Sequence, residues 1–124
     1  MNLADYFEKT EGLGVLGTAD GSGHVDLAVY ARPHVVDEET VALVMSDRLS
    51  HDNLKTNPHA AYLFVEAGEG YQGKRLYLTR TREETDPKQV EAMRRQGRKG
   101  HDYGQAQKFL VYFKIDKVRP LVGD

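Results

Sequence analysis

The pattern of apolar and polar residues along the chain predicts a β-hairpin near the N-terminal end. Residues 13–18 form a short apolar run. Residues 19–23 follow as a turn signal, because Asp and Gly readily adopt the positive φ angles that hairpin turns require. From His24 to Arg32 apolar and polar residues alternate, which is typical of a strand. This second strand is expected to pair with the first.

Four more runs have the character of strands. Val41 to Met45 is almost continuously apolar, which is typical of a strand buried on both faces. The other three runs are apolar or alternate with period two, and they cover residues 59–66, 74–82 and 108–117. The sequence therefore predicts six short strands.

Only short helices are predicted between these strands. Residues 3–10 place their apolar side chains on one face at helical spacing. Residues 46–58 contain several N-cap residues and end at an Asn-Pro pair, which predicts a second short helix. Pro87 opens a polar helix that we expect to end at Gly97.

The order of these elements predicts the fold class. A doubly wound parallel sheet would need a long helix in nearly every connection. Six short strands with tight turns favour instead a closed or half-closed antiparallel barrel. We therefore expect a mainly β protein with short helices, built as a six-stranded antiparallel split β-barrel in one domain over residues 1–124.

Composition and charge exclude several function classes. The 124 residues include no Cys, which removes disulfides, thiol nucleophiles and thiolate metal sites. The net charge of −2 gives no global field for nucleic acid or acidic lipid. No apolar run approaches the roughly 20 residues of a membrane span, and the first residues lack the basic character of a signal peptide. We expect a cytoplasmic protein without membrane or nucleic-acid partners.

Two local patterns suggest other chemistry but do not change this picture. His51-Asp52 and His101-Asp102 repeat a dyad that helical metal-dependent phosphohydrolases use, yet most of this chain is predicted as strand, so no metal site is expected. The basic residues of 94–101 follow an acidic stretch, which favours a solvated helix with opposite charges at its ends.

Four stretches in their order and spacing resemble a known family. They are the opening hairpin, the strand and short helix with the "Asn-Leu … Asn-Pro" connection, the strand from Lys74, and the closing strand with its tail, found at residues 14–29, 46–61, 73–78 and 108–121. Together they resemble the split-barrel flavin-binding family related to pyridoxamine 5'-phosphate oxidase. The resemblance covers most of the chain, from about residue 6 to 121.

This resemblance implies FMN as cofactor, bound at the interface of a homodimer. The second strand and the turn before the short helix would hold it, and the partner chain would cover it. By position, the implied cofactor-binding residues are Asp26, Leu27, Ala28, Ser46, Asp47, Arg48, Ser50, His51, Asn53 and Tyr71.

The chemistry of a phosphate fits the turn before the short helix. A phosphate dianion needs hydroxyl and amide donors together with a cation, and a helix N-terminus offers aligned N–H groups. Arg48 can bind a phosphate through two parallel hydrogen bonds, although it also fits a solvated surface charge. Ser46 and Ser50 can contact the phosphate or cap the helix.

The remaining implied contacts have alternatives as well. Asn53 can support the turn as a purely structural residue, and the Asp26 carboxylate can face water or a partner chain. Tyr71 lies at a Gly-rich hairpin tip, where it can stack on a partner chain's flavin or remain an ordinary exposed tyrosine.

The chain also departs from the family. Ser50 stands where the family often has a phosphate-binding Lys, and there is no Trp of the kind that the oxidase's substrate-binding segment contains. We therefore expect a flavin-dependent oxidoreductase of unknown substrate and unknown catalytic residues, not pyridoxamine 5'-phosphate oxidase itself. A non-catalytic flavin carrier, or a dimeric split barrel that has lost flavin, remains as an alternative.

Overall fold

In the computed structural model, residues 2–96 and 108–123 are described, and they form seven strands and three helices. The elements follow one another as α1 (Leu3–Lys9), β1 (Gly12–Ala19), β2 (Val25–Val29), β3 (His34–Asp37), β4 (Thr40–Ser46), α2 (Leu49–Thr56), β5 (His59–Glu66), β6 (Gly73–Glu84), α3 (Pro87–Gln96) and β7 (Lys108–Pro120).

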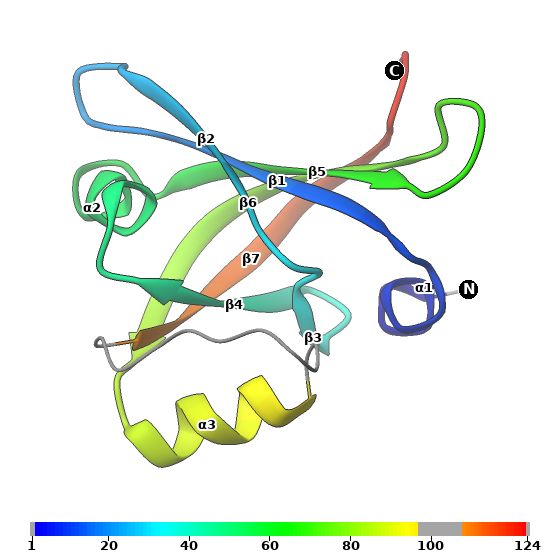
Figure 1. The fold of residues 1–124 in the computed structure, drawn as a ribbon. Helices are drawn as coiled ribbons and strands as arrows, with labels where there is room; N and C mark the ends of the chain where they lie inside the picture. The colour runs from blue at the N-terminus through cyan, green and yellow to red at the C-terminus, as the bar shows by residue number, and fades with distance from the viewer. Residues whose placement is uncertain (1, 97–107, 124) are drawn as a thin grey trace.

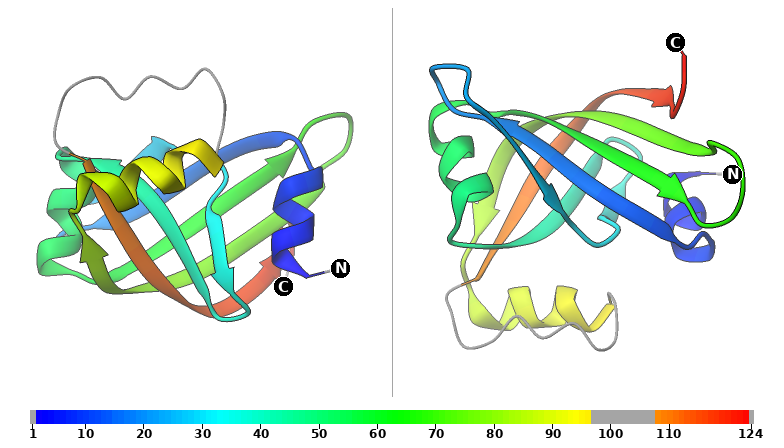
Figure 2. Two further views of the ribbon diagram at one scale, coloured as in Figure 1. Left: turned by 90° about the horizontal axis from the view of Figure 1, so that it is seen from below. Right: turned by 45° about the horizontal axis from the view of Figure 1, so that its top comes forward.

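All the strands belong to one antiparallel sheet with the order β2-β1-β5-β6-β7-β4-β3. The sheet is strongly curved, so that β4 and β7 face β1 and β5 across the interior (Figures 1 and 2). The predicted mainly β, antiparallel split-barrel class is confirmed. The shortest element, β3, is the strand that the sequence pattern missed.

The interior of the barrel is filled by side chains from alternate positions of the strands. Period-two spacing directs every second side chain inward, and these residues pack with apolar side chains of the two end helices. The core consists of Phe7, Leu16, Val41, Leu43, Met45, Leu54, Tyr62, Phe64, Leu76, Leu78, Val111 and Phe113.

The strand β4 is buried on both faces, as its continuous apolar run predicted. Val41, Leu43 and Met45 face the barrel interior. Ala42 and Val44 belong instead to a second cluster with Leu110, Tyr112 and Val90 of α3. The helix α3 therefore covers the outer face of β4 and β7 (Figure 1).

The helices α1 and α2 lie at opposite ends of the barrel (Figure 1). Phe7 of α1 and Leu54 of α2 both reach the core. Asn2 caps α1, and its side chain accepts a hydrogen bond of 2.9 Å from the backbone N–H of Asp5. No helix in the described ranges is long and apolar enough to cross a membrane.

Two element boundaries differ from the sequence prediction. The second strand ends at Val29 rather than at Arg32, and His34–Asp37 forms the separate edge strand β3. A four-residue edge strand that follows a proline is too short to give a periodic signal. The predicted end of α3 at Gly97 lies outside the described residues, as do residues 98–102 of the basic stretch and the second His-Asp dyad.

The apolar side chains of β2, which alternate with the other residues of the strand, face solvent. Val25, Leu27 and Val29 are 74%, 70% and 71% exposed, whereas Asp26 and Ala28 are half-buried. Among the described strands, β2 lies at the edge of the sheet and pairs only with β1. The strand therefore leaves both an apolar row and an unpaired edge on the surface.

Close packing around Gly14 predicts a large effect of one added methyl group. A Cβ at this position would overlap the Tyr62 hydroxyl and lie 2.5 Å from the carbonyl oxygen of Tyr30. We expect Gly14→Ala to lower the free energy of unfolding by about 1–3 kcal/mol, the usual cost of overpacking. Gly17→Ala is the matched control on β1, because its Cβ would meet the movable Leu27 side chain at 3.3 Å. Denaturant unfolding of the two variants checks this, and equal stabilities would contradict it.

Burial at His34 predicts a loss of stability in mild acid. Burial lowers the pKa of His34 below its usual value near 6.5, because the charged ring is poorly solvated there. Below about pH 6.5 the unfolded chain therefore takes up this proton more readily than the folded chain, and the stability that neutral His34 provides is lost as the pH falls. We expect the unfolding free energy of His34→Gln to decrease less than that of the wild type between pH 7.5 and 5. Parallel pH profiles of the two proteins would refute this.

Candidate cofactor-binding site

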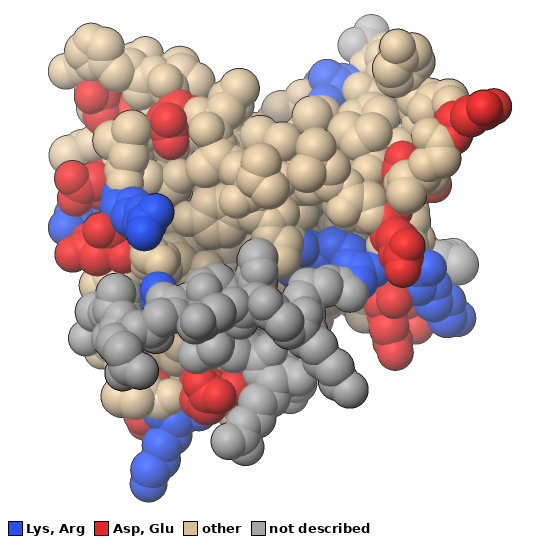
Figure 3. Space-filling model, viewed as in Figure 1, with Lys and Arg blue, Asp and Glu red and all other residues tan. Residues whose placement is uncertain are grey.

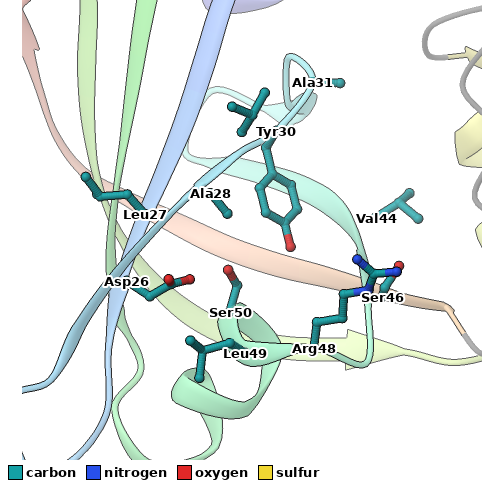
Figure 4. Close-up of a pocket in the computed structure, with 11 residues that line it drawn as sticks. Asp26, Leu27, Ala28, Tyr30, Ala31, Val44, Ser46, Arg48, Leu49 and Ser50 are labelled. Atoms are coloured by element: carbon teal, nitrogen blue, oxygen red, sulfur yellow. The ribbon is translucent and has the colours of Figure 1, made fainter.

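A cavity of about 400 Å³ lies between β2 and the N-terminal end of α2. This volume falls in the range of small-molecule and cofactor pockets. Residues from β2, the segment after it, the end of β4 and the start of α2 line the cavity (Figure 4). They are Asp26, Leu27, Ala28, Val29, Tyr30, Ala31, Val44, Ser46, Arg48, Leu49 and Ser50.

The start of α2 offers hydrogen-bond donors to this cavity. Arg48 is the N-cap residue, and its side chain makes no capping hydrogen bond. Ser50 is 4% exposed as a residue and lines the cavity, and no other described residue bonds to its hydroxyl. Among the described residues no buried side-chain polar atom lacks a partner, so this hydroxyl is open to the cavity, where a ligand or water can bond to it.

Two cations lie at this end of the cavity. Arg48 and Ser46 both line the cavity (Figure 4). Lys108, the first residue of β7, donates a hydrogen bond of 2.8 Å from Nζ to the Ser46 hydroxyl oxygen. Neither the Ser46 nor the Ser50 side chain caps α2 in the described part of the chain. The alternative that these serines cap the helix is therefore wrong.

The opposite side of the cavity is acidic and partly apolar. Asp26 lies across the cavity from Arg48, and the Tyr30 ring lies between them (Figure 4). The Tyr62 hydroxyl donates to the carbonyl oxygen of Ala31 at 3.1 Å, and burial raises the pKa of Tyr62, so it remains a neutral donor. This bond fixes the segment that carries Tyr30 against the barrel.

Four residues that the resemblance implied as contacts do not line the cavity. Asp47 is mostly exposed and reaches His51, with Oδ1 3.3 Å from Nδ1. Asn53 is buried, and its amide donates to the Thr18 hydroxyl at 3.0 Å, as in the structural alternative for this residue. Tyr71 is 81% exposed at the β5–β6 hairpin tip, where only a second copy of the chain can bring it near a cavity.

His51 is the fourth implied contact residue that does not line the cavity, and it anchors α2 instead. Its side chain is 3% exposed, and Nε2 lies 2.9 Å from Glu83 Oε2. The imidazole stacks on Phe109 with the ring centroids 3.9 Å apart. His51 therefore joins the start of α2 to β6 and β7.

The sequence analysis did not identify several residues of this site. Tyr30, Val44 and Leu49 line the cavity, and Lys108 contacts one of its lining residues. Lys108 lies 62 residues from Ser46 along the chain, and only the β4–β7 pairing places the two opposite each other. Leu49 offered a local signal of this site in the sequence, because it is an apolar residue within the polar stretch at the start of α2. In the structure Leu49 is exposed.

The arrangement suits a ligand with an anionic end. Ser46, Ser50, Arg48 and the α2 N–H groups present donors and positive charge at one end. The lining contains no histidine, and no three His, Asp or Glu residues gather as metal ligands within residues 2–96 and 108–123.

Comparisons with known proteins agree with this fold. No family model matches the sequence, and no curated protein is significantly similar to it. An FMN-binding protein from Syntrophomonas wolfei has a similar structure, with a TM-score of 0.77 and 18% identity over 96% of this chain and 83% of that one. A candidate pyridoxamine 5'-phosphate oxidase from Lactobacillus delbrueckii gives 0.69 and 15% over 94% and 88%.

A third solved structure has a different named ligand. HutZ, the haem storage protein of Vibrio cholerae, superposes with a TM-score of 0.68 and 16% identity over 97% of this chain and 95% of that one. At these identities the likeness concerns the fold. The chain thus has the fold of the split-barrel proteins related to pyridoxamine 5'-phosphate oxidase, as the four sequence stretches predicted.

Proposed function

We propose that this chain is a flavin-binding protein that holds FMN in the cavity between β2 and α2. The observation that carries the proposal is the Ser50 hydroxyl, which is open to the cavity and bonds to no other described residue. Together with Arg48 and the start of α2 it forms a donor set suited to a phosphate group. The bound flavin would supply the redox chemistry, and the protein would supply position and electrostatics.

Haem is a second ligand to consider, because HutZ shares the fold. Proteins hold haem iron through His, Cys, Met or Tyr side chains. Of these types, the described residues of the cavity lining include only Tyr30, whereas the donors and the arginine of the lining suit a phosphate. The chemistry of the lining therefore favours the flavin.

The surface around the cavity supports a homodimer. Leu27 points away from the cavity in Figure 4, and Val25, Val29 and Leu49 are also exposed beside it. Figure 3 shows few charged side chains over the centre of this face, where β1 and β2 lie. A second copy of the chain would bury this apolar row, cover the edge of β2 and close the cavity.

We further propose that the bound flavin takes part in an oxidoreduction with a substrate still to be identified. One test distinguishes an enzyme from an electron carrier on the same fold. Bleaching of the visible flavin bands by a reduced nicotinamide, followed by recovery with an added acceptor, supports the enzyme. A yellow protein that no reduced nicotinamide bleaches supports the carrier.

The Arg48 guanidinium is expected to bind the flavin's phosphate. Loss of a charged hydrogen bond costs about 1.5–3 kcal/mol, so Arg48→Ala should weaken FMN binding roughly tenfold to a hundredfold. Arg119→Ala at the other end of β7 is the control and should bind as the wild type does. Flavin fluorescence titration measures both, with haem titrated in parallel. Wild-type protein that retains haem but not FMN would overturn the proposal.

A charge on β2 is expected to break the dimer and release the flavin. Val25→Asp places a carboxylate in the apolar row at a residue outside the cavity lining, and burying it in an interface would be costly. We expect light scattering after gel filtration to report a monomer that retains little FMN. Val36→Asp, on the far edge strand β3 and 47% exposed, is the matched control and should remain dimeric. An unchanged dimer of Val25→Asp would exclude this face as the interface.

A further inference from the structure

Lys108 brings a second positive charge to the cation end of the cavity. It is half-buried at the start of β7 and lies directly opposite Ser46 in the β4–β7 register. Its ammonium donates to the Ser46 hydroxyl oxygen at 2.8 Å. Because Ser46 lines the cavity, this lysine is one hydrogen bond away from any ligand that Ser46 binds.

The contact also determines how the Ser46 hydroxyl can act. A serine oxygen that accepts a hydrogen bond from an ammonium keeps its own proton for another acceptor. An anion bound to Ser46 would then lie within about 5.5 Å of the Lys108 nitrogen, which is two hydrogen-bond lengths. At that distance, in a partly buried site, the charge of the lysine stabilises the anion.

The position of Lys108 is held by neighbouring contacts. The next residue, Phe109, stacks on the buried His51 of α2, and His51 in turn lies 2.9 Å from Glu83 of β6. The start of β7 is thereby held against the start of α2. Lys108 at the start of β7 contacts Ser46, and Arg48 at the start of α2 lines the same cavity as Ser46.

We propose that Lys108 makes the site selective for a flavin with a terminal phosphate monoester over the same flavin without phosphate. A phosphate monoester carries close to two negative charges near neutral pH, and Arg48 supplies one balancing charge. Lys108 would supply the second balancing charge from β7. This inference rests on the proposed flavin binding.

The test compares FMN with riboflavin, which lacks the phosphate. Lys108→Gln removes the charge and keeps an amide that can still donate to Ser46. We expect the Kd of this variant for FMN to rise about tenfold or more, which corresponds to the loss of one charge-assisted contact. Its Kd for riboflavin should stay within about twofold of the wild-type value, because riboflavin has no phosphate for the lysine to stabilise. Lys108→Arg should retain most of the preference for FMN. Lys114→Met, on the same strand and exposed, is the control and should bind both flavins normally.

The outcomes separate this inference from the proposed function. A wild type that binds neither flavin removes both. A wild type that binds both, with a Lys108→Gln variant that keeps the full preference for FMN or loses both flavins equally, overturns the role of Lys108 and leaves flavin binding in place. Thermal melting verifies that each variant is folded. If Lys108→Gln does not fold, Lys108→Met replaces it, and an unchanged FMN preference in that variant overturns the inference equally.

Discussion

The seating of α2 on the end of the barrel is the constraint on which the candidate site depends. Three buried side chains hold this short helix: Leu54 in the core, Asn53 on Thr18 of β1, and His51 between Glu83 and Phe109. Eight residues are too few for a stable helix by themselves, so tertiary contacts decide both its formation and its direction. Its N-terminus consequently points into the cavity with Arg48 and Ser50 beside it.

The residues that the resemblance implied as cofactor contacts have two different roles in the structure. His51 and Asn53 stabilise the helix, whereas Ser46, Arg48 and Ser50 face the cavity. A polar residue buried to hold an element and a polar residue directed at a ligand have the same character in sequence. Their hydrogen-bond partners distinguish them: described protein atoms satisfy the Asn53 amide and the His51 ring, whereas none satisfies the Ser50 hydroxyl.

The face that carries β2 links the site to assembly. The half-buried residues Asp26 and Ala28 of β2 line the cavity, and the exposed residues are the apolar row of Val25, Leu27 and Val29, of which Leu27 and Val29 also border the cavity. One strand thus borders both the cavity and the proposed partner surface, and its successive side chains alternate between its two faces. A shift of one residue in the β1–β2 register would exchange these two sets, so the site and the proposed interface depend on the same pairing.

The sequence by itself determined the mainly β class, six of the described strands and the three helices, because period-two runs, turn residues and caps are local signals. It also indicated the segments around Asp26 and Arg48 that line the cavity. Only the tertiary structure decided that the apolar side of β2 faces outward, since alternation identifies two faces but not which one is buried. Likewise, only the β4–β7 pairing brought Lys108 to Ser46. Contacts between residues so distant along the chain depend on strand register, which no local pattern encodes.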